Sequence, residues 1–201
     1  MNKKYILFLI FFIFPFFLCA EKEQESEIPP FFNNRINFNL LRFGYERTKD
    51  NSFYFGSEIS TFYTIEKSLI SQGEIRFGYN YKPHTRNKIT PFLSIGSLEN
   101  RGRKTHSIIE TFFKPLEISY GGIGVRYEHI FGKIFSLGLN TQWMHGVNCW
   151  HMYTQGFNIS TPFTWRFTKS RNWDIRLEPF YTRFSHNFSM GGVVTSFGYS
   201  F

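Results

Sequence analysis

Residues 74–82 read EIRFGYNYK, and this stretch decides the fold class. Its apolar residues Ile75, Phe77, Tyr79 and Tyr81 stand at every second position, with polar or small residues between them. Successive side chains of a β-strand point to opposite faces, so a period of two predicts a strand with one apolar and one polar face.

The same alternation recurs over most of the chain. Nine segments show it: 36–47, 52–64, 73–82, 88–98, 116–130, 134–145, 156–168, 173–184 and 192–201. No segment has a competing helical period, so the sequence predicts an all-β, antiparallel fold. The apolar residues change phase at Leu40-Leu41 and at Gly121-Gly122, and a one-residue change of phase predicts a β-bulge at each place.

The apolar faces are too large for the inside of a small barrel. Aromatic residues make up 21% of the chain and include 27 Phe. An eight-stranded barrel has an interior only just wide enough for side chains, so these rings must point outward, into lipid. Most segments also reach the roughly nine to eleven residues that a tilted strand needs to cross a bilayer. We therefore predict a closed antiparallel up-and-down transmembrane β-barrel of eight to ten strands, with ten preferred.

The polar faces of the strands then point into the lumen. They carry both signs of charge, so we predict cross-strand ion pairs that plug the barrel. The predicted luminal charge network consists of Arg42, Glu46, Glu58, Glu74, Arg76, Arg126, Glu128, Arg166, Arg176 and Glu178.

The first residues have the features of a secretory signal peptide. Lys3 and Lys4 precede an apolar run, and Ala20 precedes a polar stretch. We predict a signal peptide over residues 1–20, which directs export through the inner membrane. Lipidation at Cys19 remains an alternative fate of this segment.

The mature chain divides into two parts. Residues 21–35 form a polar tail that includes a candidate first strand, and residues 36–201 form the transmembrane barrel. The mature chain keeps a single cysteine, Cys149, so it cannot form an internal disulfide.

The chain ends with VTSFGYSF, in which Phe197, Tyr199 and Phe201 alternate with small residues. This ending resembles the C-terminal aromatic β-signal of Gram-negative outer-membrane β-barrel proteins, and the chain as a whole is similar to the small OmpA/OmpX-like barrels. The resemblance implies location in the cell outer membrane and assembly by the barrel-assembly machinery. It also implies contact with outer-membrane lipid and lipopolysaccharide, and a monomeric state.

Connection lengths predict the topology. Short connections (48–51, 83–87, 131–133 and 169–172) alternate with long ones (65–72, 99–115, 146–155 and 185–191). In bacterial outer-membrane barrels short turns face the periplasm, long loops face outward and the strand number is even. Nine segments therefore leave eight or ten strands open, and residues 28–35 are the candidate tenth strand.

A weak, partial resemblance to lipid A 3-O-deacylase barrels raises the question of catalysis. Those barrels carry a His-x-Ser-Asn motif, and here His145 and Asn148 stand at its outer positions. Val147 occupies the serine position, so the nucleophile for acyl hydrolysis is missing. We predict a non-enzymatic protein with a structural or surface-interaction role; the alternatives are a lipid A-modifying, deacylase-like hydrolase and a narrow pore.

Few other residues suggest a binding site. Arg101, Arg103 and Lys104 lie in a predicted outer loop, where basic side chains could contact lipopolysaccharide phosphates. We predict no metal site, because His145, His151 and Cys149 fit solvated loop positions better than a zinc ligand set. We also predict no cofactor and no nucleic-acid partner, because the sequence has no Gly-rich phosphate loop and no nucleic-acid-binding motif.

Overall fold

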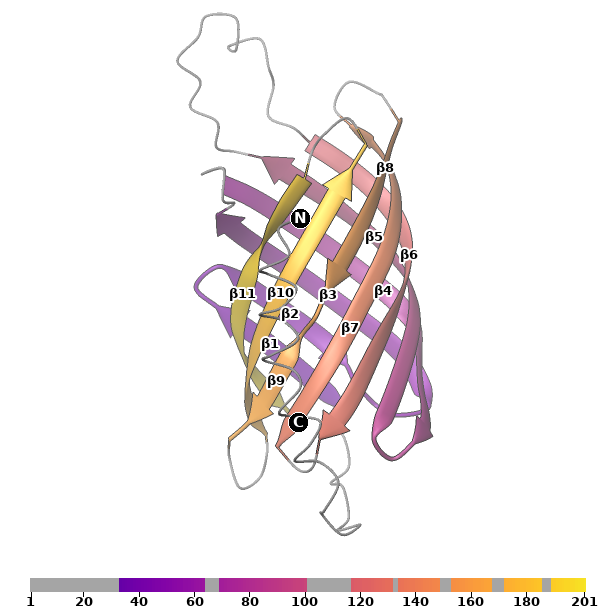
Figure 1. Ribbon diagram of the computed structural model, residues 1–201, viewed down its shortest axis with the longest axis vertical. Coiled ribbons are helices and arrows are strands. Elements are labelled where there is room, and N and C mark those ends of the chain that lie inside the picture. The colour runs from indigo at the N-terminus through magenta and orange to yellow at the C-terminus, as the bar shows by residue number, and fades with distance from the viewer. Residues whose placement is uncertain are drawn as a thin grey trace, which may run out of the picture.

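The computed structural model of the chain is a closed antiparallel β-barrel (Figure 1). The structure describes residues 33–63, 69–100, 117–131, 134–148, 153–167, 172–185 and 189–201. Its strands are β1 (Asn34–Asn39), β2 (Arg42–Arg47), β3 (Ser52–Tyr63), β4 (Leu69–His84), β5 (Asn87–Asn100), β6 (Glu117–Phe131), β7 (Phe135–Asn148), β8 (Tyr153–Ser160), β9 (Phe163–Arg166), β10 (Trp173–Phe184) and β11 (Ser189–Ser200). Consecutive strands pair, except β8 with β9, and β11 pairs with both β10 and β1, which closes the wall. The predicted fold class is confirmed.

The barrel has ten strands, because β8 and β9 are two parts of one strand. Both keep the same register against β7 and against β10 on either side of Thr161-Pro162. Proline has no N–H to donate, so the ladder is interrupted there without a change of register. Within the described residues no helix is long and apolar enough to cross a membrane.

The tenth strand does not come from the segment that the sequence suggested. Segment 36–47 is a hairpin of β1 and β2, and the predicted bulge at Leu40-Leu41 is in fact its turn. The Asn39 side chain accepts a hydrogen bond from the Leu41 backbone N–H at 2.6 Å and so stabilises the turn. A chain reversal changes the phase of the alternation just as a bulge does, and two leucines lack the usual Asn-Gly signal of a tight turn. Of segment 28–35, residues 28–32 lie outside the described part of the chain.

The predicted bulge at Gly121-Gly122 is also wrong. β6 pairs residue by residue with β5 and with β7 through this point, with no shift of register. The change of phase is instead a change of which face carries the apolar side chains. Ile118 and Tyr120 point into the lumen, whereas Ile123 and Val125 point outward.

Ile118 and Tyr120 belong to an apolar cluster inside the barrel. The cluster lies at the ends of the strands away from the C-terminus and is almost completely buried. Its members are Ile70, Leu98, Ile118, Tyr120, Met144, Phe184 and Met190, with Phe180 packed against them. Seven large side chains fit there because small residues stand beside them. Tyr120 lies over Gly96, and Phe184 lies over Gly156.

Gly124, nearer to the C-terminal end of the barrel, likewise lies against a ring that points inward, so one added methyl group there should destabilise the barrel. A Cβ atom at Gly124 would lie 2.4 Å from the Phe92 ring and 2.6 Å from the Thr141 carbonyl oxygen. We expect Gly124→Ala to lower the free energy of unfolding by about 1–3 kcal/mol, the usual result of overpacking. Denaturant titration in lipid vesicles measures this.

Gly73→Ala is the matched control, because a Cβ atom there meets only the Ser97 hydroxyl, at 3.9 Å. Gly73→Ala should be neutral or slightly stabilising, since alanine has less conformational freedom to lose on folding. Equal losses for the two variants would mean that Phe92 does not pack against Gly124.

The exterior of the barrel is apolar. Large side chains on every strand are exposed there, among them Phe53, Ile75, Leu93, Ile123 and Leu177. Such an exterior is stable only in lipid, and a closed barrel satisfies its backbone hydrogen bonds without water.

Aromatic rings form a belt at the end of the barrel where the chain terminates. Trp173 lies 4.8 Å from Tyr199, and Trp165 lies 6.3 Å from Phe135 and 6.1 Å from Phe167, measured between ring centroids. Belts of this kind lie at membrane interfaces.

The other end of the exterior is uneven. On β5 and β6 the outward residues nearest the strand ends are small or acidic: Ser97, Glu99, Glu117, Ser119 and Gly121. On β7 and β8, by contrast, Val147 and Tyr153 place apolar side chains at the strand ends. The apolar surface is therefore lower over β5 and β6 than over β7 and β8.

Candidate functional site: the luminal charge network

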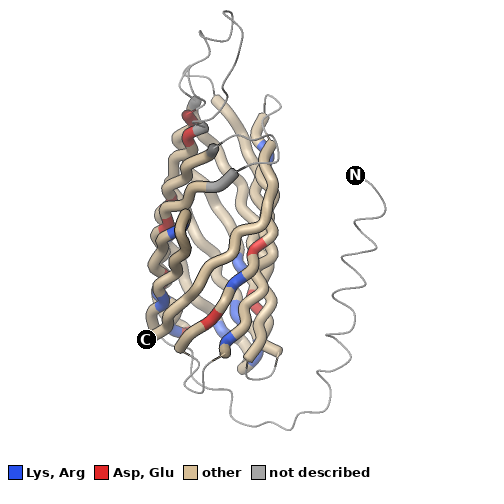
Figure 2. The backbone as a smooth tube through the Cα atoms, turned by 90° about the vertical axis from the view of Figure 1, so that its left-hand side faces the viewer, with Lys and Arg blue, Asp and Glu red and all other residues tan. Residues whose placement is uncertain are grey.

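Every residue of the predicted luminal charge network lies on the inner face of the barrel. Figure 2 shows that Lys and Arg gather mainly in the half of the barrel near the C-terminus. The structure adds Arg35, Lys88 and Asp174 to the set, all of them buried. The network is built around three carboxylates, at successive levels of the lumen.

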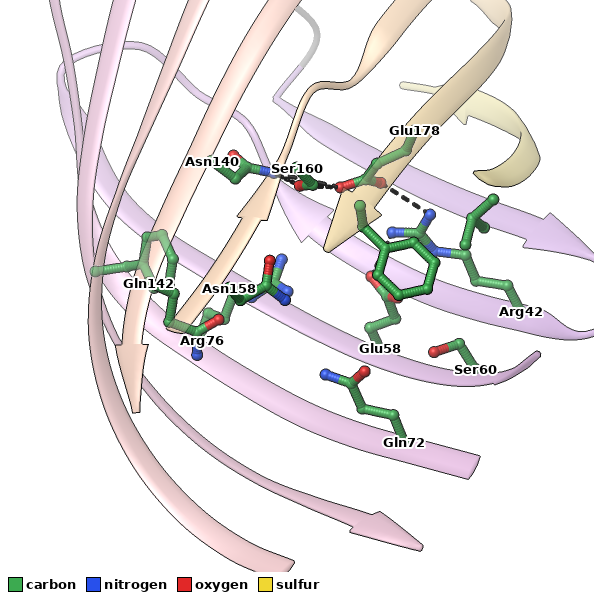
Figure 3. A pocket seen from close by; sticks show the side chains of 13 residues that line it. Arg42, Glu58, Ser60, Gln72, Arg76, Asn140, Gln142, Asn158, Ser160 and Glu178 are labelled. Atoms are coloured by element: carbon green, nitrogen blue, oxygen red, sulfur yellow. Dashed lines mark hydrogen bonds and ion pairs between the residues drawn. The ribbon is translucent and has the colours of Figure 1, made fainter. Parts of the chain in front are cut away.

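The first centre is Glu178 on β10. The Arg42 guanidinium donates to Glu178 at 3.0 Å and to Glu58 at 2.6 Å, and so links three strands (Figure 3). Ser160 donates to the second oxygen of Glu178 at 2.8 Å, and the Asn140 amide donates to the same oxygen at 3.3 Å. Both oxygens of this buried carboxylate therefore have donors.

The second centre is Glu74 on β4. Arg76, on the same strand, donates to one of its oxygens through Nε at 2.8 Å. Gln142 reaches across from β7 and donates to the other oxygen at 2.6 Å and to Ser94 at 2.7 Å. The Arg76 guanidinium also lies 5.6 Å from the centre of the Phe92 ring, a cation–π contact.

The third centre is Glu46 on β2, which faces three arginines. Arg126 contacts it at 3.0 Å, Arg176 at 3.6 Å and Arg35 at 3.9 Å. Arg35 also forms a two-point contact with the buried Asp174, which includes an Nε–Oδ2 bond of 3.0 Å. These contacts join β1, β2, β6 and β10 across the lumen.

Further ion pairs lie nearer to the turns at the end of the barrel that holds the C-terminus. Arg166 lies 3.7 Å from Glu128, and Asp50 in the β2–β3 turn lies 2.8 Å from Lys82 and 3.6 Å from Lys88. The network thus extends from the middle of the barrel to this end, while the apolar cluster occupies the other end.

Side chains of both groups point into the interior. A cavity of about 50 Å³, enough for a few water molecules, lies between Arg42, Gln72, Asn158, Glu178 and their neighbours. The recess beneath it, beside Tyr54 and Glu46, has no space for water. Ion pairs and hydrogen bonds therefore cross the lumen at Glu46, Glu74 and Glu178.

The residues of the deacylase-like alternative do not meet in the lumen. His145 points outward and stacks on Tyr153, with ring centroids 5.9 Å apart. Val147, in the motif's serine position, also faces outward, and Asn148 is the last residue of β7. The described residues contain no group of three or more His, Cys, Asp or Glu that could hold a metal ion.

Several predicted features lie outside the described part of the chain. They are the signal peptide, Cys19, Arg101, Arg103, Lys104, Cys149 and His151.

The rings of the predicted β-signal lie on the outer face of β11. Phe197 stacks on Phe38 of β1 at 6.4 Å, and Tyr199 stacks on Phe201 at 6.1 Å. Phe201 and Asn34 exchange two backbone hydrogen bonds of 3.0 Å, which complete the β1–β11 seam. These rings thus lie where the barrel closes; their recognition by the assembly machinery stays a prediction.

Sequence comparison finds no relative: no family model matches the chain, and no curated protein matches it. Among solved structures, the chain is similar to KdgM porin, at 16% identity over 84% of this chain and 97% of the porin, with a TM-score of 0.38. It is also similar to a loop L8 deletion mutant of OmpT, an outer-membrane protein of Vibrio cholerae, at 7% identity over 84% of this chain and 62% of the other, with a TM-score of 0.41. At these values the likenesses carry no argument, and the assignment rests on the closed wall, the apolar exterior and the aromatic belt.

The chain is a β-barrel of the outer-membrane type.

Sequence reasoning missed part of the contents of this barrel's lumen. Asp174 stands at an inward position of β10, so the period of two already placed it on the same face as Arg176 and Glu178. Arg35 was assigned to the polar tail of residues 21–35, whereas the structure places it on the inner face of β1. The neutral partners Asn140, Gln142 and Ser160 also stand at inward positions of alternating segments, so the period of two indicated their location as well. The inward apolar cluster could not be found in this way, because large apolar residues were assigned to the lipid face.

Proposed function

We propose that this protein is a small, non-enzymatic outer-membrane barrel whose lumen is plugged and whose role is structural or one of surface interaction. The observation that carries the proposal is the filled interior: ion pairs around Glu46, Glu74 and Glu178 at one end and the apolar cluster at the other. A buried charge that loses its partner is strongly unfavourable, so each of these side chains holds its neighbours in place.

A plugged barrel acts through its surfaces. Its lumen braces the wall, and we propose that the connections at the end away from the C-terminus contact other molecules. The longest of these connections, residues 101–116 between β5 and β6, contains Arg101, Arg103 and Lys104. We propose that these three side chains contact lipopolysaccharide phosphates, because guanidinium and ammonium groups form strong charge-assisted hydrogen bonds with phosphate.

The plugged lumen predicts that the refolded protein does not conduct ions. Added to a planar lipid bilayer, it should give no steady current steps, because the ion pairs around Glu46 and Glu178 cross the lumen and the cavity beside them, of about 50 Å³, holds only a few waters. Heat-modifiable migration on a gel shows that the sample is folded.

A designed variant provides the positive control for this measurement. Replacing Arg42, Glu58 and Glu178 together by serine removes one complete ion-pair centre with both of its signs and widens the lumen, so brief openings should appear. Steady, ion-selective channels from the unaltered protein would overturn the plugged-barrel proposal and favour a narrow pore.

A further inference from the structure

Outward-facing acidic side chains occur at only one end of the described barrel. Glu99 and Glu117 are cross-strand partners on β5 and β6, and they face outward at the strand ends away from the C-terminus. Every other described carboxylate side chain lies on the luminal face or, as Asp50 does, in a turn where it contacts lysine. Among the described residues, no acidic side chain therefore faces outward at the end that holds the C-terminus.

Basic side chains project from this C-terminal end, next to the aromatic belt (Figure 2). Arg47 faces outward on β2 and is exposed, Lys49 is exposed in the turn that follows, and Arg86 lies in the β4–β5 turn. None of the three forms an ion pair within the described part of the chain. A local excess of exposed positive charge attracts anionic partners.

Arg86 belongs to a polar cluster on the outside of β4, β5 and β6. Its backbone carbonyl accepts a hydrogen bond from the Ile130 N–H at 2.9 Å, which ties the β4–β5 turn to β6. His84, Asn87 and His129 stand in one row across the three strands, because Asn87 pairs with both histidines in the ladder. We call these four residues, His84, Arg86, Asn87 and His129, the Arg86 cluster.

Hydrogen bonds fix the orientation of the amide in this cluster. The Asn87 Oδ1 accepts from the Tyr127 hydroxyl at 3.0 Å and lies 2.6 Å from the His129 Nδ1. The NH₂ group of Asn87 is left as a donor, and no described residue accepts from it. The Arg86 cluster thus offers positive charge and hydrogen-bond donors without a carboxylate. Phosphate, which only accepts, matches this set.

The surface beside the Arg86 cluster, towards the middle of the barrel, is apolar and aromatic. Tyr81, Ile89 and Tyr127 form the next outward row on the same three strands. Phe131 packs on the other side, with its ring centroid 4.5 Å from that of His129. Aromatic rings at the end of a barrel wall lie at the membrane interface. A molecule that covers both surfaces must combine an anionic head with an apolar part.

We propose that the Arg86 cluster binds the phosphate of an anionic phospholipid, such as phosphatidylglycerol, in the leaflet at the C-terminal end of the barrel. The phosphate oxygens accept hydrogen bonds from Arg86 and Asn87, and an acyl chain lies against Tyr81 and Ile89. A zwitterionic head fits less well, because no outward acidic side chain of the described chain accepts its ammonium group there. A soluble anion or a cell-wall glycan would leave the apolar row uncovered.

Photo-crosslinking tests this proposal. The refolded full-length barrel is placed in phosphatidylcholine vesicles that contain a small fraction of phosphatidylglycerol with a diazirine at the head-proximal end of one chain. Mass spectrometry should find a several-fold excess of crosslinks on residues 81–89 and 127–131 over residues 117–121 at the other end of β6. Phosphatidylethanolamine with the same label should show no such excess. Equal labelling by the two lipids would overturn the proposal.

Two variants separate the site from the net charge of the protein. Arg86→Gln keeps the backbone bond to Ile130 and should reduce the phosphatidylglycerol excess several-fold. Arg183→Gln removes an exposed, outward arginine near the opposite end of β10 and should leave the excess unchanged. An equal reduction in both variants would overturn the proposal, since it indicates attraction by overall charge alone.

Unfolding gives a second measurement, which needs no label. A ligand that binds only the folded state raises the midpoint of denaturant unfolding. Replacing part of the phosphatidylcholine by phosphatidylglycerol should raise this midpoint more for the unaltered protein and for Arg183→Gln than for Arg86→Gln. The same rise in all three proteins would contradict a site at Arg86. Retention of the detergent-solubilised barrel on purified peptidoglycan, lost in Arg86→Gln, would overturn the proposal in favour of a cell-wall partner.

Discussion

Glu46→Ala should lower the free energy of unfolding by about 3–5 kcal/mol, the usual result when one partner of a buried ion pair is removed. Glu46 is the one carboxylate that contacts Arg126, Arg176 and Arg35 together, and its side chain is almost fully buried. Its loss removes the carboxylate that Arg126 and Arg176 contact, while Arg35 keeps Asp174. Denaturant titration of the refolded barrel in vesicles measures the effect.

Two further variants separate charge from packing. Glu117→Ala removes an exposed carboxylate at the rim of β6 and should change stability by less than about 0.5 kcal/mol. The double variant Glu46→Ala/Arg176→Met should recover part of the loss, because it removes one of the uncompensated charges together with the carboxylate. A Glu46→Ala barrel as stable as the unaltered one would show that the arginines are hydrated rather than paired.

Leu93→Arg should cost about 2–4 kcal/mol, the penalty for a cation near the bilayer midplane on the lipid face of a barrel. Leu93 lies halfway along β5, points outward and is flanked by Phe77 and Ile123 on the neighbouring strands. Unfolding titrations in vesicles of two chain lengths would test the dependence on depth, since a thinner bilayer brings the charge closer to water.

The control for this variant is the same charge at the rim. Glu117→Arg places an arginine at the outer end of β6 and should cost no more than about 1 kcal/mol. If Leu93→Arg were harmless and Glu117→Arg were severe, the apolar exterior would not be the surface that contacts lipid.

The period of two was sufficient to predict most of this fold. It located the strands from β3 onward to within a few residues, and it separated a lipid face from a luminal face. It failed where different structural features leave the same pattern in the sequence. A turn, a bulge and a change of environment along one strand all shift the phase of apolar residues, so Leu40-Leu41 and Gly121-Gly122 were both misread.

The sequence predicted which charged residues face the lumen, but it did not predict which apolar residues do. Arg42, Glu46 and Glu178 face the lumen because their strand positions require it, but no pattern says which carboxylate meets which arginine. Those partners come from the curvature and stagger of the closed barrel, which bring β2 close to β10. The luminal position of Tyr120 and Phe184 depends on Gly96 and Gly156 beside them, a relation between strands that one strand's pattern does not contain.

The uneven upper edge of the apolar exterior has a consequence for how the barrel sits in its membrane. Ser97, Glu99 and Ser119 on β5 and β6 begin the polar surface several residues before the strands end, whereas Val147 and Tyr153 place apolar side chains at the rim of the neighbouring strands β7 and β8. A bilayer of uniform thickness cannot match both heights around an upright cylinder, and mismatch is relieved by inclination of the protein or by local thinning of the bilayer. The barrel axis should therefore lean away from the membrane normal, with thinner bilayer beside β5 and β6.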